Sequence, residues 1–398
     1  MSRFLYWILF LSYCSLYAPF GAAEEAFAGC VADLQRKARQ QGLGPKIVDE
    51  VLGGVKFAPK VIELDRRQPE FTATFADYLN KRVTEDRVKR GRELLARHRK
   101  LLDQLLRQYG VPPQYLVAFW GLESNYGVYL GYMPVLDSLA TLACDQRRSE
   151  FFTTQLLTAL HLIGPRGVEP DQMQGSWAGA MGHTQFMPET YKKYAVDGDG
   201  DSRVDLWNSI PDAMASAANF LAGLGWKTGL RWGREVVLPE NFTYKEVGIQ
   251  NRRPLNEWRE LGIVTAFGGP IPQADVQAAL LVPAGHQGPA FLVYDNFDVI
   301  MEWNRSEFYA LAVGYLADRI NGGGTLKQPP PDQPPLSIAQ VKELQTRLNT
   351  LGFEAGEPDG ILGPGTRRAI RALQHQRDMV ADGYPAAAVL KELGISLE

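Results

Sequence analysis

Tyr115-Leu-Val-Ala-Phe-Trp-Gly-Leu122 is an almost wholly apolar run, which is followed by Glu123 and then by Ser124-Asn-Tyr-Gly127. The run predicts a buried helix. Pro112-Pro113 suits the first turn of such a helix, and the asparagine and glycine after Glu123 tolerate the left-handed conformations that end one. Glu123 therefore falls in the last turn of an apolar helix, where a lone carboxylate is a candidate general acid.

The surroundings of Glu123 should affect its proton. The negative end of the helix dipole and the apolar neighbours Phe119, Trp120 and Leu122 disfavour the charged form, so we expect a raised pKa for this carboxyl. A carboxylic acid that is still protonated near neutral pH can donate to a leaving oxygen. A glutamate that frays into solvent at a helix end is equally compatible with this segment taken alone.

The N-terminus predicts an exported protein. An apolar stretch from Phe4 to Phe20 precedes small residues, which predicts a signal peptide over residues 1–23 with cleavage after Ala23 and a periplasmic destination. An uncleaved membrane anchor is the second interpretation, because the stretch is about as long as the shortest spanning helices. Lipid attachment at Cys14 or Cys30 is the third.

The cysteines that would remain after cleavage are Cys30 and Cys144. An even pair in an exported protein favours one disulfide, which would restrain the unfolded state by closing a long loop. Two unpaired buried thiols are the alternative.

Length and charge set wide limits on function. The 398 residues suffice for a large core and a second module. The 42 basic and 45 acidic residues give no reason to expect nucleic acid as a partner, and no other apolar run could span a membrane. Eight tryptophans and sixteen tyrosines suit a carbohydrate groove and an ordinary aromatic core equally.

The middle of the chain predicts helices around a small β-region. Leucines at helical spacing between Val83 and Tyr109 predict one or two amphipathic helices. Ser209 can cap another helix that runs to Leu221, with Asp212 reaching back in the manner of a capping box. Short β-rich pieces at 279–282 and 290–294 predict a sheet or hairpin, and helix resumes over 306–320.

A composition change marks a second module. Residues 322–336 hold three glycines and then five prolines, which predicts a linker that is flexible first and stiffly extended after. Residues 337–395 beyond it show helical apolar spacing around a glycine-rich turn, which predicts a short helical module.

The segment Gly175–Tyr191 is as unusual as the first. Its closely spaced glycines and alanines let backbone approach a ligand, while Ser176 and Gln185 supply neutral donors and acceptors of the kind that read hydroxyl and acetamido groups. Taken alone, the segment could equally be a tight helix-packing loop.

Together these motifs resemble the lytic murein transglycosylase B family. The resemblance covers about residues 30–320 and is carried by Gly121-Leu-Glu-Ser-Asn-Tyr-Gly127, Gly175-Ser-Trp-Ala-Gly-Ala-Met-Gly182, Gln185-Phe-Met-Pro188 and Trp303-Asn-Arg-Ser306. The C-terminal module is similar to the peptidoglycan-binding domain of many wall enzymes through Leu344-Gln-Thr-Arg-Leu348, Gly352-Phe353, Asp359-Gly360 and Leu373-Gln374.

The resemblance implies a mainly α (α+β) fold. A lysozyme-like catalytic domain with a small inserted β-region would occupy residues 30–321, and a three-helix peptidoglycan-binding module would occupy residues 337–395. The implied partner is the glycan strand of peptidoglycan, no cofactor is required, and other cell-wall enzymes remain open as partners. The sequence does not define the oligomeric state.

The implied reaction cleaves the β-1,4 bond between N-acetylmuramic acid and N-acetylglucosamine without water. Glu123, as the single catalytic residue, would act first as acid and then as base while the 6-hydroxyl closes a 1,6-anhydro ring. Ordinary glycosidases use a second carboxylate. The family's substrate contacts carry over to Tyr78, Ser176, Gln185, Trp303, Asn304 and Tyr309. Phe220 stands where some members have tyrosine, so a hydroxyl there is missing.

The loop 197–208 suggests calcium, which some relatives bind here. Asp197, Asp199, Asp201 and Asn208 are the candidate ligands at EF-hand-like spacing. Ser202 replaces the glycine of the sharp turn, and Asn208 offers one neutral oxygen where a bidentate glutamate belongs. A metal-free turn held by Asx hydrogen bonds is the alternative. His161 and His183 have no partners at metal-ligand spacing, which favours structural roles, although His183 could still line the groove.

Two other functions compete with the transglycosylase. One is a hydrolytic muramidase that admits water, and the other is a non-catalytic peptidoglycan-binding scaffold built on a decayed enzyme. The presence of Glu123, Ser176 and Gln185 argues against the scaffold.

Overall fold

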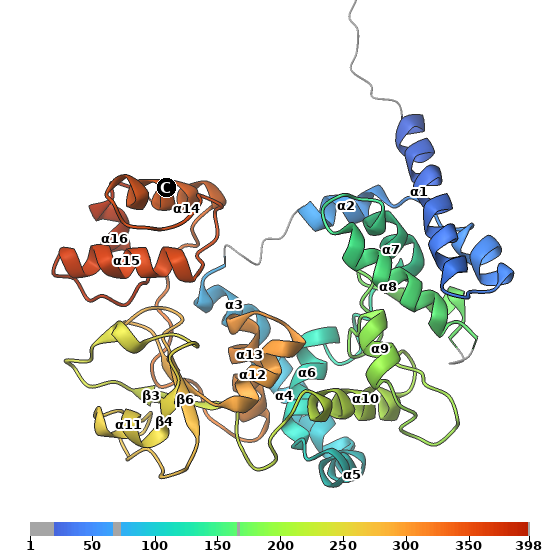
Figure 1. The fold of residues 1–398 in the computed structure, drawn as a ribbon. Helices are drawn as coiled ribbons and strands as arrows, with labels where there is room; N and C mark the ends of the chain where they lie inside the picture. The colour runs from blue at the N-terminus through green and yellow to red at the C-terminus, as the bar shows by residue number, and fades with distance from the viewer. Residues whose placement is uncertain (1–19, 67–72, 165–167, 397–398) are drawn as a thin grey trace, which may run out of the picture.

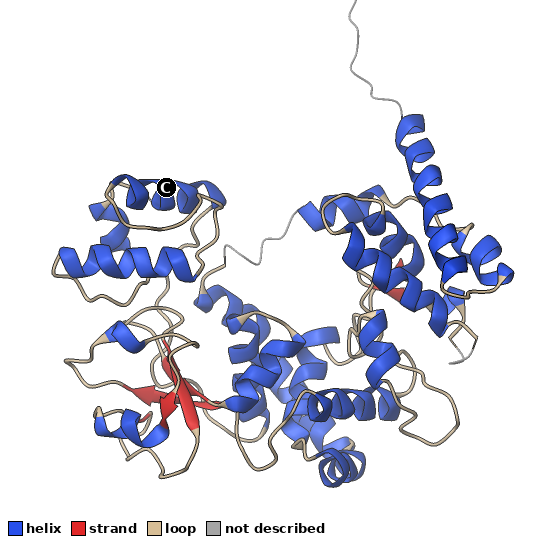
Figure 2. Cartoon of the chain, viewed as in Figure 1, coloured by secondary structure: helices blue, strands red, loops and turns tan. Residues whose placement is uncertain are grey.

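The computed structural model describes residues 20–66, 73–164 and 168–396 of the chain (Figure 1). These residues are mainly helical, with two small antiparallel sheets (Figure 2). The mainly α (α+β) fold class predicted from the sequence is confirmed. Most of the predicted signal segment, including Cys14, lies outside the described residues.

An N-terminal group of helices packs around α7 (Val135–Ala143) and α8 (Ser149–Leu162). The group also contains α1 (Phe20–Gln40), the π-helix η1 (Lys46–Leu52) and α2 (Pro59–Arg66). The predicted cleavage position after Ala23 falls within α1. A disulfide joins Cys30 of α1 to Cys144, the C-cap of α7. Among the described helices, none combines the length and the apolar character that crossing a bilayer needs.

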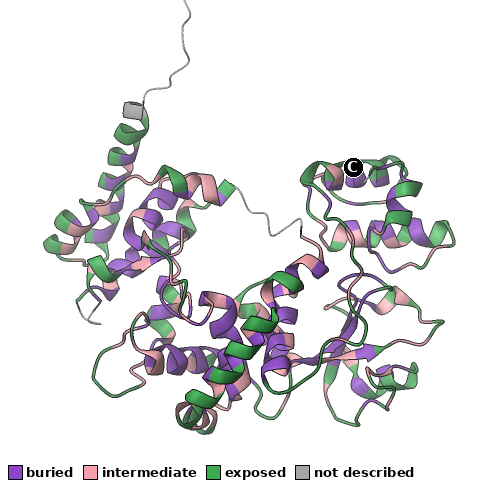
Figure 3. Cartoon of the chain, turned by 180° about the vertical axis from the view of Figure 1, so that it is seen from behind, coloured by how far each residue is buried: buried purple, intermediate pink, exposed green. Residues whose placement is uncertain are grey.

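The apolar run 115–122 forms the central helix α6 (Pro113–Ser124), whose neighbours enclose it on several sides. Its packing partners are α4 (Glu85–Arg97), α5 (Arg99–Tyr109), α10 (Ile210–Gly223) and α13 (Glu307–Ile320). In Figure 3, buried residues lie where such helices meet and exposed ones cover the outer faces. Ten of the twelve α6 residues are buried, so this helix is a fixed base for Glu123 near its end.

The helical part also contains α3 (Phe75–Arg82), α9 (Pro188–Tyr194), α12 (Asp295–Trp303) and the short 3-10 helix η3 (Pro170–Gln172). The predicted amphipathic segment 83–109 is two helices, because the chain leaves helical geometry at His98. Ser209 caps α10 by accepting from the N–H of Asp212. The second half of the predicted capping box, in which the Asp212 side chain reaches back to Ser209, is wrong. The Asp212 carboxylate accepts from the N–H groups of Gly198 and Asp205 instead.

The predicted β-region is a five-stranded antiparallel sheet with the order β4-β6-β7-β3-β5. Its strands are β3 (Gly233–Val237), β4 (Arg253–Pro254), β5 (Val264–Thr265), β6 (Gln277–Leu281) and β7 (Ala290–Val293). One face packs on the helical core through Leu281 and Phe291, and the other packs on α11 (Leu255–Glu260) through Leu280 and Leu292. Because both faces are buried, β7 and residues 278–281 of β6 are continuous apolar runs. The smaller sheet pairs β1 (Met133–Pro134) with β2 (Gln174–Gly175).

The C-terminal module has its own hydrophobic core, formed by α14 (Ile338–Thr350), α15 (Pro364–Gln376) and α16 (Ala387–Glu392). It lies beside the β-region in Figure 1. The chain between the two is held at several points. The backbone N–H groups of Lys327 and Gln328 donate to the Glu235 carboxylate at 3.0 and 2.8 Å. The N–H of Leu326 donates to the hydroxyl of Tyr315.

Candidate functional site

The C-terminal end of α6 has an unusual backbone. Asn125, Tyr126 and Gly127 all have positive φ, at 49°, 62° and 84°. Such values are uncommon for a bulky residue, and they persist only where the surroundings impose them. The hydroxyl of Tyr126 donates to the carbonyl of Arg87 at 2.7 Å, and the N–H of Gly127 donates to Oγ of Ser124 at 3.1 Å. This turn therefore fixes the position of Glu123, the residue before Ser124.

Glu123 is half-buried, and a tyrosine contacts its carboxylate directly. The hydroxyl of Tyr309 donates to Oε1 of Glu123. Tyr309 lies in the first turn of α13, where its N–H donates to Oγ of Ser306, and its side chain is buried. Burial, and next the charge of Glu123, raise the pKa of Tyr309 well above its usual value. The hydroxyl thus stays protonated and remains a hydrogen-bond donor to Glu123.

Aromatic rings cover the α6 face one turn before Glu123. Trp303, at the end of α12, stacks on Phe119 with a ring-centroid distance of 4.3 Å. Phe220 packs on the same tryptophan at 5.0 Å and Phe186 packs on it at 5.5 Å. Phe220 therefore belongs to this aromatic cluster and offers it no hydroxyl.

The segment around Ser176 and Gln185 forms tight turns. Oγ of Ser176 accepts from the N–H groups of Ala178 and Ala180. Gln185 has a φ of 49°, and its side-chain amide donates to the carbonyls of Leu130 and Gly182. The two polar residues are half-buried. Their orientation is thus set by backbone groups of the segment itself and by the carbonyl of Leu130.

His183 links this segment to the end of α6. Its Nδ1 accepts from the indole N–H of Trp120 at 3.0 Å, and its carbonyl accepts from the hydroxyl of Ser124 at 2.9 Å. Burial lowers the pKa of His183, partly opposed by the charge of Asp205, so the ring is suited to accept rather than donate at Nδ1. A structural role for His183 was predicted, but its pairing with Trp120 carries no signal in the sequence.

The remaining predicted contacts are Tyr78 and Asn304. Tyr78 is a buried residue of α3, and its ring centroid is 5.9 Å from that of Phe308. The guanidinium carbon of Arg82 lies 5.5 Å from the centre of the Tyr78 ring. Asn304 is the exposed C-cap of α12 and directly follows Trp303.

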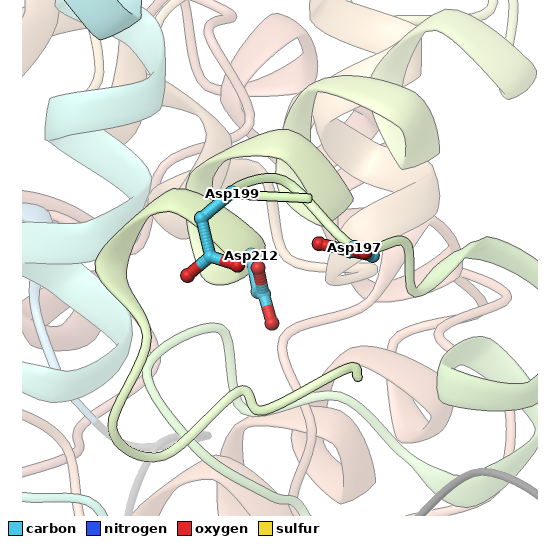
Figure 4. Close-up of side chains that lie close together, drawn as sticks. All are labelled: Asp197, Asp199 and Asp212. Atoms are coloured by element: carbon cyan, nitrogen blue, oxygen red, sulfur yellow. The ribbon is translucent and has the colours of Figure 1, made fainter. Parts of the chain in front are cut away.

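The acidic loop before α10 brings together a different set of carboxylates from the one predicted. Oxygen atoms of Asp197, Asp199 and Asp212 lie within 4.8 Å of one another (Figure 4). Asp201 is not in this group, and its carboxylate accepts from the N–H of Arg203. The side-chain amide of Asn208 donates to Asp205. Carboxylate oxygens suit calcium, so Asp197, Asp199 and Asp212 are the residues that could hold this ion.

The same loop also satisfies its own backbone. The Asp197 carboxylate accepts from the N–H groups of Gly200 and Ser202 at 2.6 and 2.8 Å. The hydrogen bond from Gly200 is the largest cause of the lowered pKa of Asp197. The sequence does not mark Asp212 as a candidate ligand, because its position three residues after Ser209 indicates only a capping role.

Comparisons with known proteins agree on one family. A family model described as the transglycosylase SLT domain matches residues 26–318, and one described as a putative peptidoglycan binding domain matches residues 337–393. The chain is 29% identical over 309 residues to membrane-bound lytic murein transglycosylase B of Escherichia coli K12, with 72% of this chain and 81% of the relative covered.

Solved structures extend the likeness to the fold. SltB3 from Pseudomonas aeruginosa in complex with NAG-anhNAM-pentapeptide is similar with a TM-score of 0.88 at 45% identity, over 92% of this chain and 99% of that one. The Escherichia coli lytic transglycosylase Slt35 in complex with calcium gives a TM-score of 0.64 at 29% identity, over 73% of this chain and 92% of that one. The chain therefore belongs to the transglycosylase SLT domain family, and it is a lytic transglycosylase of peptidoglycan.

Proposed function

We propose that Glu123 is the single catalytic carboxyl group of a reaction that cuts the β-1,4 bond between N-acetylmuramic acid and N-acetylglucosamine and leaves a 1,6-anhydromuramic acid end. The observation that carries this proposal is the hydrogen bond from Tyr309 to Glu123 at the fixed end of α6. The relative SltB3, in complex with NAG-anhNAM-pentapeptide, supports the product.

The composition of the three motif segments supports the single-residue mechanism. The segments 121–127 and 175–188 contain no acidic residue other than Glu123. The segment 303–309 contains Glu307, which lines a cavity that also borders Arg367 of the C-terminal module. A retaining or inverting glycosidase needs two carboxyl groups that flank the scissile bond.

The proposed step returns the proton it uses. Glu123 donates its proton to the glycosidic oxygen as the bond from C1 to that oxygen breaks, and the acetamido carbonyl of the muramic residue stabilises C1. The Glu123 carboxylate then accepts the proton of the 6-hydroxyl while O6 bonds to C1. The products are an anhydro end and a free 4-hydroxyl, and Glu123 is protonated again.

The neighbouring residues have separate roles in this proposal. Tyr309 orients the Glu123 carboxyl and stabilises its ionised form between the two proton transfers, because the tyrosine hydroxyl stays protonated. Trp303 provides an apolar face for a sugar ring. Ser176, Gln185, Asn304 and Tyr78 contact the polar groups of the substrate.

Analysis of the products tests the reaction. Purified murein sacculi digested by the wild type should yield fragments with 1,6-anhydro ends, which are lighter by one water than reducing ends in mass spectrometry. Reducing ends in their place would sink the proposal in favour of the hydrolytic muramidase.

A pair of variants tests the residue. Glu123→Gln should stop the clearing of sacculi, whereas Glu302→Gln, an exposed glutamate of α12, should clear them like the wild type. Equal clearing by Glu123→Gln and wild type would remove Glu123 from its role. The absence of clearing by every form would favour the non-catalytic scaffold.

The proposal places the enzyme in the periplasm, with residues 1–23 as its export signal and residues 337–395 as its attachment to the polymer. Sequencing the N-terminus of the protein recovered from the periplasm should begin at Glu24. Recovery of a membrane-bound form that retains residues 1–23 would contradict cleavage and favour an uncleaved anchor.

Calcium, in this proposal, is a ligand of the loop before α10. Asp197, Asp199 and Asp212 would hold the ion and so stabilise the start of α10. The complex of Slt35 with calcium supports the assignment. Calcium takes no part in the proposed bond cleavage.

A further inference from the structure

A cavity of about 460 Å³ lies between the catalytic part and the C-terminal module. We call it the interdomain cavity. Its walls come from residues 73–75, 247–251, 281–283 and 306–308 on one side, and from residues 333–336, 361–371 and 382–385 on the other. Its volume falls within the usual range of small-ligand sites, and such sites favour the boundaries between domains.

The two walls are joined by a polar contact that fixes their spacing. One oxygen of Asp382 accepts from the backbone N–H of His286 at 2.8 Å and contacts Nδ1 of the same histidine at 2.7 Å. The other oxygen accepts from the side chain of Gln374 and from the N–H of Tyr384. Asp382 is almost fully buried by these partners. Gly285 touches Asp382 and Tyr384 so closely that an added Cβ would lie 2.8 Å from each.

The module's wall carries an excess of positive charge. Three arginines of α15 line the cavity, namely Arg367, Arg368 and, one turn from Arg367, Arg371. Within the described part of the chain, no salt bridge joins any of the three to a carboxylate. Burial, and next the charge of Arg367, lower the pKa of Arg371. Three guanidinium groups thus share one half-enclosed space.

The facing wall offers too little negative charge to balance them. Glu307 lines the cavity opposite the arginines, and Arg367 acts on it electrostatically. Burial is the largest influence on Glu307 and raises its pKa. Asp382 is the other carboxylate in the lining, and its oxygens already accept hydrogen bonds from His286, Gln374 and Tyr384. A ligand that carries carboxylates would neutralise the remaining positive charge of the three arginines.

The interdomain cavity is connected to the proposed site through the first turn of α13. Glu307 and Phe308 line it from the first turn of α13, and the next residue, Tyr309, donates to Glu123. The ring of Phe308 also packs against Tyr78. The start of α13 therefore joins the lining of the cavity to two proposed substrate contacts, Tyr78 and Tyr309.

We propose that the interdomain cavity is a subsite for the carboxylates of the peptide stem of peptidoglycan. Arginine guanidinium groups pair with carboxylates in a forked geometry, which suits the short acidic peptide better than the neutral sugars. The inference rests on the proposed peptidoglycan substrate, and it adds that the enzyme reads the peptide as well as the glycan.

Titration of the full chain with a free wall pentapeptide tests the subsite, because this probe has no sugar to occupy the catalytic residues. The double variant Arg367→Gln/Arg371→Gln should bind the pentapeptide at least about tenfold more weakly than the wild type. Lys391→Gln removes an exposed charge of the same module away from the cavity and should bind like the wild type. A pentapeptide whose carboxylates are amidated should bind the wild type as weakly as the free peptide binds the double variant.

The Glu307→Gln variant should change the affinity for the pentapeptide in the opposite direction. Removal of a like charge from the cavity should tighten binding of the anionic peptide about threefold, a gain that a misfolded variant would not produce. Equal pentapeptide affinities for wild type and double variant would overturn the proposal, as would the absence of measurable binding to the wild type or an amidated peptide that binds as well as the free one. Failure of the proposed chemistry is separate, because it appears as reducing ends in the digest of sacculi.

Discussion

Tyr309→Phe is expected to slow glycan cleavage while leaving the fold intact. The change removes only the hydroxyl that donates to Glu123, and the phenyl ring keeps its place in a pocket that also contains Phe119, 6.3 Å away between centroids. A hydrogen bond to a charged group contributes about 1.5–3 kcal/mol, so loss of this one during the reaction should lower kcat about 10- to 150-fold. The ring contacts remain and only one hydroxyl is removed, so the free energy of unfolding should change much less than kcat.

The rate profile against pH sharpens this test. The hydroxyl stabilises the ionised carboxylate, so its removal should keep Glu123 protonated to higher pH. The pH at which kcat falls on the alkaline side should therefore increase. Tyr315→Phe is the matched control, because its hydroxyl lies on the same helix and contacts Arg319 and Leu326 instead. Release of soluble fragments from sacculi measures kcat. An unchanged kcat together with an unchanged pH profile in Tyr309→Phe would refute the role of this hydrogen bond.

Three other changes have defined outcomes. Gly127→Ala should unfold at lower urea concentration than Gly225→Ala: both glycines have positive φ, but only a Cβ at Gly127 meets the His183 ring, at 2.2 Å. The free energy of unfolding should fall as pH drops below about 6.5, since burial lowers the pKa of His183 and the unfolded chain then binds more protons. In urea titrations, the free energy of unfolding of His183→Asn should depend less on pH than that of the wild type. The same pH dependence in both proteins would contradict the contribution of His183. Millimolar calcium should raise the Tm of the wild type and not that of Asp199→Asn, and equal shifts in calorimetry would exclude Asp199 as a ligand.

Local patterns predicted the helices that carry the site. The apolar run and the prolines before it gave α6 its bounds, and Ser306 correctly marked the start of α13. The break at His98 was not resolved in advance, because the apolar spacing continues across it. The predicted hydrogen bond from Asp212 back to Ser209 was wrong, because a carboxylate one turn into a helix can also accept from a neighbouring loop. Here two N–H groups of the loop donate to Asp212 in place of Ser209.

Contacts between distant residues were less accessible to sequence reasoning. Tyr309 was identified through a family resemblance as a substrate contact, whereas its hydrogen bond to Glu123 depends on how α13 packs against α6. The same holds for Trp120 and His183, which belong to separate motifs. The composition of residues 322–336 predicted a linker that is flexible first and stiffly extended after. Composition carries no information about Glu235, whose carboxylate accepts from two of the linker's backbone N–H groups.

The five-stranded sheet separates two hydrophobic clusters and belongs to both. Leu281 and Phe291 serve the helical core, while Leu280 and Leu292, their immediate neighbours, serve the cluster around Trp258. Neither cluster can open without exposing strands that the other needs, so the helices around α6 and the β-region should melt as one cooperative unit. A loss of packing beneath α11 should therefore also lower the stability of the helices around α6.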